Sequence, residues 1–129
     1  SNLKIILSEI KTIVMIGASS NPYRDSFKVM KYLMDCGYEV FPVNPNESKN
    51  LILGRKVYSN IKEIKKKIDM VDIFRDKKYV HDITNDSIDI GVKVIWTQEG
   101  IVDNKSAEIA RKADVIFIMD ECPKKILEN

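Results

Sequence analysis

Apolar residues gather in five short runs, and the stretches between them repeat apolar positions every three or four residues. A continuous apolar run is typical of a strand buried on both faces of a parallel sheet, whereas the longer spacing predicts an amphipathic helix. The predicted strands cover residues 12–16, 39–43, 70–74, 92–96 and 115–119, with a short extended piece at 54–58. The predicted helices cover residues 3–11, 26–36, 61–68, 80–90 and 104–113, with a last short helix from Pro123.

This alternation of strands and helices is typical of βαβ units, so we expect an α/β protein with helices on both faces of the sheet. Right-handed crossovers favour a Rossmann-like, open parallel five-stranded sheet of order 3-2-1-4-5, with strands numbered along the chain. A length of 129 residues suits a single domain, which we place at residues 3–129. Ligands bind such sheets beyond the carboxyl ends of the strands, where the strand order reverses, here between strands 1 and 4.

Charge and composition narrow the classes of function. The formal net charge is +2, which gives no field suited to nucleic acid or to an acidic membrane surface. No apolar run approaches the roughly 20 residues that span a bilayer. The two cysteines are too few for a disulfide framework and fit no zinc pattern. We therefore expect a cytoplasmic protein that binds a small molecule, without nucleic acid, membrane or metal.

The segment after the first strand, IGASSNPYRDS at residues 16–26, has the character of a phosphate-binding loop. Gly17 allows a tight turn with no side chain between backbone and ligand. The polar residues 19–21 offer donors, and Ser26 is the predicted N-cap of a helix whose free N–H groups favour an anion. Arg24 can add a bidentate contact to a phosphate. The alternative is a plain strand-to-helix turn with a capping serine.

The segment after the second strand argues against NAD. A dinucleotide site has an Asp or Glu at this point to bind the ribose hydroxyls. Here the chain continues through Asn44, and Glu47 follows only several residues later. The cations Lys49 and Arg55 come next and suit an additional ribose phosphate, as in NADP or in the 3′-phosphorylated ADP of coenzyme A. Either cation taken alone is more typical of solvated surface.

The ends of the third and fourth strands supply further polar residues. Arg75 follows the buried run VDIF and is expected at the ligand edge of the sheet. Asp72 within that run is expected to be partly buried and satisfied by backbone donors. Thr97 and Gln98 can bond a polar chain such as one that contains amides, and Trp96 can form the wall of a pocket.

Taken in order, the motifs resemble the small stand-alone CoA-binding proteins, whose domain is similar to the N-terminal domain of the succinyl-CoA synthetase alpha subunit. The motifs are IGASSNPYRDSFKVMKYL, GYEVFPVNPNE with GRKVYSNIKEI, VDIFRD, GVKVIWTQEGI and MDECPK, and they extend from about residue 12 to residue 124. One departure is Glu121, where the family often has an arginine. The resemblance implies coenzyme A or an acyl-CoA as the ligand.

The resemblance also implies roles for fourteen residues at the strand ends. The pyrophosphate would be held by Gly17, Ala18, Ser19 and Ser20, with help from Arg24 and Ser26. The adenosine or upper pantetheine would be lined by Val43, Asn44 and Pro45, and the adenine or its 3′-phosphate would be flanked by Phe74 and Arg75. The pantetheine would run along Thr97, Gln98 and Glu99.

No catalytic set can be assembled from the sequence. The related acyl-CoA synthetases use a phosphorylatable histidine and an ATP-grasp partner, and the single histidine here, His81, lies on a polar stretch and is expected to be solvated. We therefore favour a binding module for CoA over an enzyme. An NADP-binding protein and a partner-dependent acyl-CoA synthetase-like subunit stay open, as does a redox role in which Cys122 forms a mixed disulfide with the CoA thiol. The sequence leaves any protein partner and the oligomeric state open.

Overall fold

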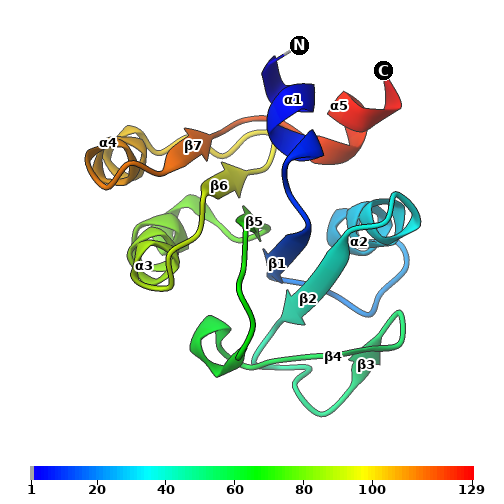
Figure 1. Cartoon of the computed structure of the whole chain (residues 1–129). Helices are drawn as coiled ribbons and strands as arrows, with labels where there is room; N and C mark the ends of the chain where they lie inside the picture. Colours follow the sequence, from blue (N-terminus) through cyan, green and yellow to red (C-terminus); the bar gives the residue numbers. More distant parts are fainter. Residues whose placement is uncertain (1) are drawn as a thin grey trace.

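The computed structural model describes residues 2–129 and contains a central parallel sheet with helices on both sides (Figure 1). The α/β class, the five parallel strands and the Rossmann-like arrangement are confirmed. Along the chain the elements are α1 (Asn2–Ser8), β1 (Thr12–Ile16), α2 (Asp25–Asp35), β2 (Glu39–Val43), β3 (Leu51–Ile52), β4 (Arg55–Lys56), the 3-10 helix η1 (Ile61–Glu63), β5 (Met70–Ile73), α3 (Lys77–Asp89), β6 (Val94–Thr97), α4 (Asn104–Lys112), β7 (Ile116–Ile118) and α5 (Pro123–Glu128).

The order of the strands differs from the sequence-based prediction. The sheet runs β2-β1-β5-β6-β7, which is 2-1-3-4-5 when its strands are numbered along the chain, so the predicted order 3-2-1-4-5 is wrong. Asp69 explains the difference, because its carboxylate accepts hydrogen bonds from the N–H groups of Lys11 and Thr12 at 2.9 and 3.3 Å. This contact holds the start of β5 beside the start of β1. The strand order therefore reverses between β1 and β5, and not between the first and fourth strands.

Alternating side chains of the central strands feed two hydrophobic cores. Ile13 and Met15 of β1 point into the core under α1, α2 and α5, whereas Val14 and Ile16 point into the core under α3, α4 and η1. Figure 1 shows the same division, with α3 and α4 on one side of the sheet and α1, α2 and α5 on the other. Helices on both faces are the reason that the central strands are apolar throughout and not alternating.

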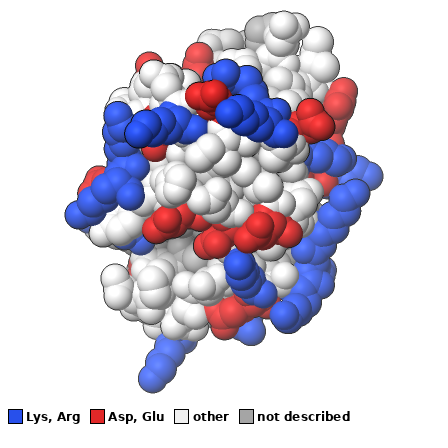
Figure 2. Space-filling model, turned by 90° about the vertical axis from the view of Figure 1, so that its left-hand side faces the viewer, with Lys and Arg blue, Asp and Glu red and all other residues white. Residues whose placement is uncertain are grey.

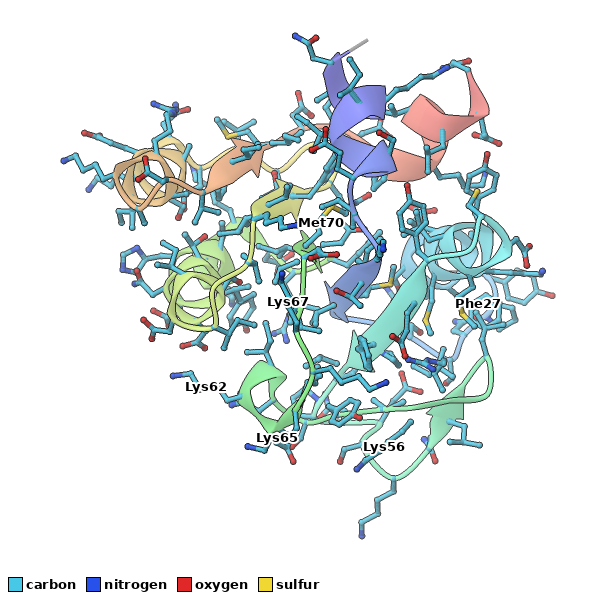
Figure 3. The ribbon with its side chains drawn as sticks, viewed as in Figure 1. Phe27, Lys56, Lys62, Lys65, Lys67 and Met70 are labelled. Atoms are coloured by element: carbon cyan, nitrogen blue, oxygen red, sulfur yellow. The ribbon has the colours of Figure 1, made fainter. Side chains whose placement is uncertain are left out.

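The predicted helix at residues 61–68 is largely absent, since only the single turn η1 forms. Asn60 and Glu63 make a capping box, but Ile64 already has extended dihedrals of φ −80° and ψ 116°. The extended path keeps Ile61, Ile64 and Ile68 all buried in one core while the chain continues toward β5. Tertiary burial has here overridden helical periodicity. Figure 3 shows Lys62 and Lys65 at the periphery of this segment, away from the sheet.

The outer surface carries charges of both signs. Figure 2 looks at the side of the molecule that α3 and α4 occupy, and acidic and basic side chains are interspersed there without a large field of one sign. This distribution agrees with the formal net charge of +2. Within residues 2–129, no helix has the length and apolar character needed to cross a membrane. A cytoplasmic location stays a prediction from the sequence.

Candidate functional site

A cavity of about 630 Å³ lies beyond the carboxyl ends of β1, β2 and β5, at the point where the strand order reverses. We call it the central cavity. Eight of the fourteen residues predicted from the sequence line it, and these are Gly17, Ala18, Ser19, Arg24, Ser26, Asn44, Phe74 and Arg75. The wrong strand order did not misplace them, because the carboxyl ends of all parallel strands share one edge of the sheet.

Gly17 is required by the fold as well as by the cavity. Its φ of +87° lies in the left-handed region, and a Cβ there would approach the Phe74 carbonyl oxygen to 2.3 Å. The N–H groups of Gly17 and Ala18 both donate to the Val43 carbonyl, at 3.0 and 3.2 Å. The loop after β1 is therefore pressed between the ends of β2 and β5. The clash with Phe74 adds a second reason for glycine to the expected backbone approach of a ligand.

Helix α2 opens directly onto the central cavity. The predicted N-cap Ser26 is wrong, because the helix begins at Asp25 with Arg24 as its N-cap and with no side-chain capping bond. Ser26 lies buried in the first turn. A helix start without a side-chain cap leaves backbone N–H groups available to an anion, and the positive end of the helix dipole adds to that attraction.

Arg75 separates the central cavity from a smaller one of about 210 Å³ on the α3 side, which we call the apolar flank. The guanidinium carbon of Arg75 lies 4.0 Å from the centroid of the Tyr79 ring, a cation–π distance. Val43 and Pro45 line this flank with Ile16 and Ile83. Two more of the predicted residues thus lie beside the central cavity.

A third cavity, of about 270 Å³, lies on the other side, and we call it the thiol flank because Cys122 lines it. It shares Asp25 and Phe74 with the central cavity, so the two cavities adjoin. The predicted residues Gln98 and Glu99 line it as well. Glu99 is paired with Lys125 of α5 at 2.8 Å, and this ion pair lies at the exposed rim.

Gln98 is oriented from below by Asp72. The side-chain amide of Gln98 donates to one carboxyl oxygen of Asp72, and the second oxygen is buried without a partner among residues 2–129. Complete burial raises the pKa of Asp72 to about 8, and the bond from Gln98 only partly opposes that shift. Asp72 is therefore a neutral acid at neutral pH. The expectation of partial burial with backbone donors is wrong.

The structure also tests the expectations for Thr97, Trp96, Arg55 and His81. Thr97 is fully buried, and its hydroxyl donates to the Ile101 carbonyl at 2.7 Å, so its side chain lines none of the three cavities. Trp96 is a core residue whose indole N–H donates to the Glu121 carbonyl, so its predicted role as a pocket wall is wrong.

The last two expectations concern charged or titratable residues. Arg55 donates to the Val40 carbonyl and to Glu39, and it lines none of the three cavities. His81 is exposed, as expected.

The sequence reasoning missed several lining residues. Tyr23, Asp25, Asn46 and Glu47 line the central cavity. Their positions in the loops after the first two strands could have suggested them. The thiol flank also takes residues from α2 and α5, such as Lys28. No local pattern indicates that these two helices pack together. Among residues 2–129 no group of three metal-ligating side chains comes together.

Comparisons with known proteins agree on one family. The family model described as a CoA binding domain matches residues 11–128. YneT of Bacillus subtilis is 34% identical over 96% of this chain and 90% of its own length. The alpha subunit of the ADP-forming acetate–CoA ligase I of Pyrococcus furiosus is 36% identical over 66% of this chain, which corresponds to only 19% of that subunit. A solved structure, a hypothetical protein from Pyrococcus horikoshii OT3, superposes with a TM-score of 0.93 at 35% identity, over 98% of this chain and 88% of that one.

Proposed function

Because the chain belongs to the CoA binding domain family, we propose that residues 3–129 bind coenzyme A or an acyl-CoA as a stand-alone module without a complete catalytic set. The observation that carries this proposal is the row of three adjoining cavities along one edge of the sheet. Arg75 joins the apolar flank to the central cavity, and Phe74 joins the central cavity to the thiol flank. Coenzyme A has three parts in the same sequence: an adenosine, a pyrophosphate and a pantetheine chain.

The central cavity suits the pyrophosphate. Gly17 and Ala18 give their N–H groups to the Val43 carbonyl, so the backbone donors to phosphate oxygens come from the later part of the loop after β1 and from the first turn of α2. The cations Arg24 and Arg75 line the same cavity and can add charge-assisted bonds. In this proposal Gly17, Ala18, Ser19 and Ser20 hold the pyrophosphate, and Arg24 and Ser26 assist them.

The apolar flank suits the adenine. Its wall contains Val43, Pro45 and Ile83, which offer an apolar surface to a purine ring. Arg75 lines both this flank and the central cavity, and in this proposal it binds either the pyrophosphate or the 3′-phosphate of the ribose. Asn44 lines the central cavity and bonds the Ala18 carbonyl at 2.8 Å, which ties the loop after β2 to the phosphate loop.

The thiol flank suits the pantetheine. Gln98 gives its N–H group to Asp72, which leaves its carbonyl oxygen as an acceptor for an amide N–H of the ligand. Val29 and Phe74 supply apolar contacts to the methylene groups of the chain. Glu99 continues the wall, whereas Thr97 is fully buried beneath it with its hydroxyl engaged internally.

A partner-dependent function is the second candidate, and one observation favours it. Several relatives named as ADP-forming acetate–CoA ligases are longer proteins, and this chain spans 19% and 26% of two Pyrococcus furiosus alpha subunits. A CoA module of this kind can act with a partner that supplies the remaining chemistry. Co-purification of a second protein, together with CoA-dependent acyl transfer by the pair, would support that candidate.

Calorimetric titration tests the proposed function directly. One apo sample is titrated with CoA, acetyl-CoA, NAD and NADP at the same ionic strength, since phosphate contacts are screened by salt. We expect CoA or acetyl-CoA to bind more tightly than either dinucleotide. Tighter binding of NADP than of CoA would reject the proposal in favour of an NADP-binding protein. A comparison of CoA with dephospho-CoA then shows whether a cation binds the 3′-phosphate.

A further inference from the structure

The side chain of Glu47, from the loop after β2, binds the predicted phosphate loop. Its two carboxylate oxygens lie 3.3 and 3.2 Å from the backbone nitrogen of Ser20, whose N–H group donates to them. Ser20 is the last residue of the stretch that we propose holds the pyrophosphate. No Lys or Arg of residues 2–129 pairs with Glu47. The Glu47 carboxylate therefore accepts a hydrogen bond from the Ser20 N–H group without an ion pair, in the described part of the chain, that would hold it in this position.

The loop after β2 is built so that Glu47 reaches this place. The Asn44 side chain donates to the Ala18 carbonyl at 2.8 Å and accepts from the Asn46 N–H at 2.9 Å. The Glu47 N–H then donates to the Asn44 carbonyl at 3.1 Å. Three hydrogen bonds therefore fix the turn that carries Glu47, and one of them anchors it to the phosphate loop itself.

The central cavity carries as many acids as cations, so the Glu47 carboxylate lowers the affinity of the cavity for an anionic ligand. The cations that line the cavity are Arg24 and Arg75, and the acids are Asp25 and Glu47. A phosphate that enters meets two carboxylates as well as two guanidinium groups. Repulsion between unit charges about 4 Å apart is about 1 kcal/mol in water and grows as water is excluded.

We infer that Glu47 is an internal placeholder for the ligand phosphate, which must displace its carboxylate from the Ser20 amide in order to bind. A tethered carboxylate is present at high effective concentration. It therefore competes with any anion from solution for the Ser20 amide, and a pyrophosphate can displace it because it can engage both arginines at once. Glu47 is thus a specificity-determining residue that disfavours anions unable to reach both arginines. The inference rests on the proposed phosphate site.

Inorganic pyrophosphate is the probe that tests the placeholder separately from CoA binding. Its affinity is measured by NMR titration of the Ser20 amide in the wild type, in Glu47→Gln and in Glu47→Ala. The matched control is Glu9→Gln, which removes one exposed acidic charge just before β1, at the opposite edge of the sheet. We expect pyrophosphate to bind Glu47→Gln about five- to tenfold more tightly than the wild type, from the loss of one repulsive charge. Glu47→Ala should gain at least as much, and Glu9→Gln should be unchanged.

The other possible results contradict either the placeholder role of Glu47 or the proposed binding of CoA. Equal or weaker pyrophosphate affinity in both Glu47 variants overturns the placeholder, and so does an absence of pyrophosphate binding in all four proteins. Titration of CoA into the same samples judges the proposed function. If pyrophosphate affinity rises in the Glu47 variants but CoA binds none of the proteins, the placeholder holds and the assignment of CoA fails.

Discussion

The central cavity and the thiol flank adjoin, yet they are built in different ways. The central cavity is formed by strand ends and by the loops that follow them, and its predicted ligand contacts are largely backbone N–H groups. The thiol flank is formed largely by side chains from α2, from the loop after β6 and from α5, with Gln98 held by a buried acid. A site made from backbone depends on loop geometry, whereas a site made from side chains depends on packing between distant segments. The two should therefore fail in different ways when residues are changed.

The largest expected effect is that of Gly17→Ala. The new Cβ would meet the Phe74 carbonyl oxygen at 2.3 Å in addition to the strain of a positive φ. We expect a loss of about 3–4 kcal/mol or more in the free energy of unfolding, measured by urea denaturation. Gly100→Ala is the matched control, because its φ is +86° and nothing lies within 4 Å of its added Cβ. That control should cost only about 1–2 kcal/mol.

Equal losses in the two glycine variants would show that the loop after β1 is not held against β5. If the Gly17→Ala protein is stable but does not bind the ligand, the clash with Phe74 is not a reason for glycine at this position. The close approach of the backbone to the ligand would then be the only reason.

The arginines of the central cavity come next in size. If Arg24 and Arg75 each contact a phosphate, changing either to alanine should cost about 1.5–3 kcal/mol in CoA binding, the range for hydrogen bonds to charged groups. Lys65→Ala is the control, because Lys65 is exposed and lies on the segment between β4 and β5, away from the cavity (Figure 3). Calorimetry on the three variants measures the losses. If all three losses are equal and negligible, the phosphate site lies elsewhere.

The buried acid beneath the thiol flank gives a pH-dependent prediction. Asp72 has a raised pKa of about 8 in the folded protein, against 3.8 for an unperturbed aspartate. Between these values the folded state keeps a proton that the unfolded chain releases. The free energy of unfolding should therefore fall as pH rises through this interval, by up to about 1.4 kcal/mol per pH unit. Urea denaturation at a series of pH values measures the slope.

Asp72→Asn should remove that slope between about pH 5 and pH 8, because asparagine does not titrate. The exposed Asp114→Asn variant should retain it. A wild-type stability that does not fall in this range would mean that Asp72 is ionised in the folded protein and that burial does not raise its pKa as described.

The smallest expected effect is a covalent CoA adduct on one cysteine. It distinguishes a reaction directed by bound CoA from a reaction at the more exposed thiol. Cys36 is exposed, whereas Cys122 is buried and lines the thiol flank. With CoA disulfide as the reagent, a protein thiol attacks the S–S bond, gains one CoA group and releases one CoA thiol. We expect intact-mass spectrometry to show the adduct in Cys36→Ser and not in Cys122→Ser. An adduct that persists in Cys122→Ser, or never forms in the wild type, would end the redox hypothesis.

The sequence predicted the central cavity better than the strand order or the thiol flank. Gly17 and Arg75 lie at strand ends and Arg24 lies at the end of the loop after β1, and the carboxyl ends of all the parallel strands lie at the same edge of the sheet whatever the order. The order itself depends on long-range contacts such as the bonds of Asp69 to Lys11 and Thr12 at the start of β1, which no local pattern reveals.

Burial explains the other differences between sequence and structure. The single turn at η1 replaces a predicted helix because three isoleucines must reach one core. The contribution of α5 to the thiol flank depends on its packing against α2, which local periodicity does not encode. In the sequence Glu47 lies several residues after the second strand, and the turn fixed by Asn44 brings it back to the phosphate loop.

The most direct test of the account is whether one ligand reaches both cavities. Amide NMR spectra are recorded with CoA and, separately, with 3′-phosphoadenosine 5′-diphosphate, which keeps the pyrophosphate and lacks the pantetheine. We predict that CoA shifts the amides of Gly17 to Ser20 together with those of Gln98, Glu99 and Cys122. The shorter ligand should perturb the loop after β1 and leave the thiol flank unchanged. If CoA leaves Gln98, Glu99 and Cys122 unshifted, or binds without perturbing Gly17 to Ser20, the central claim is contradicted.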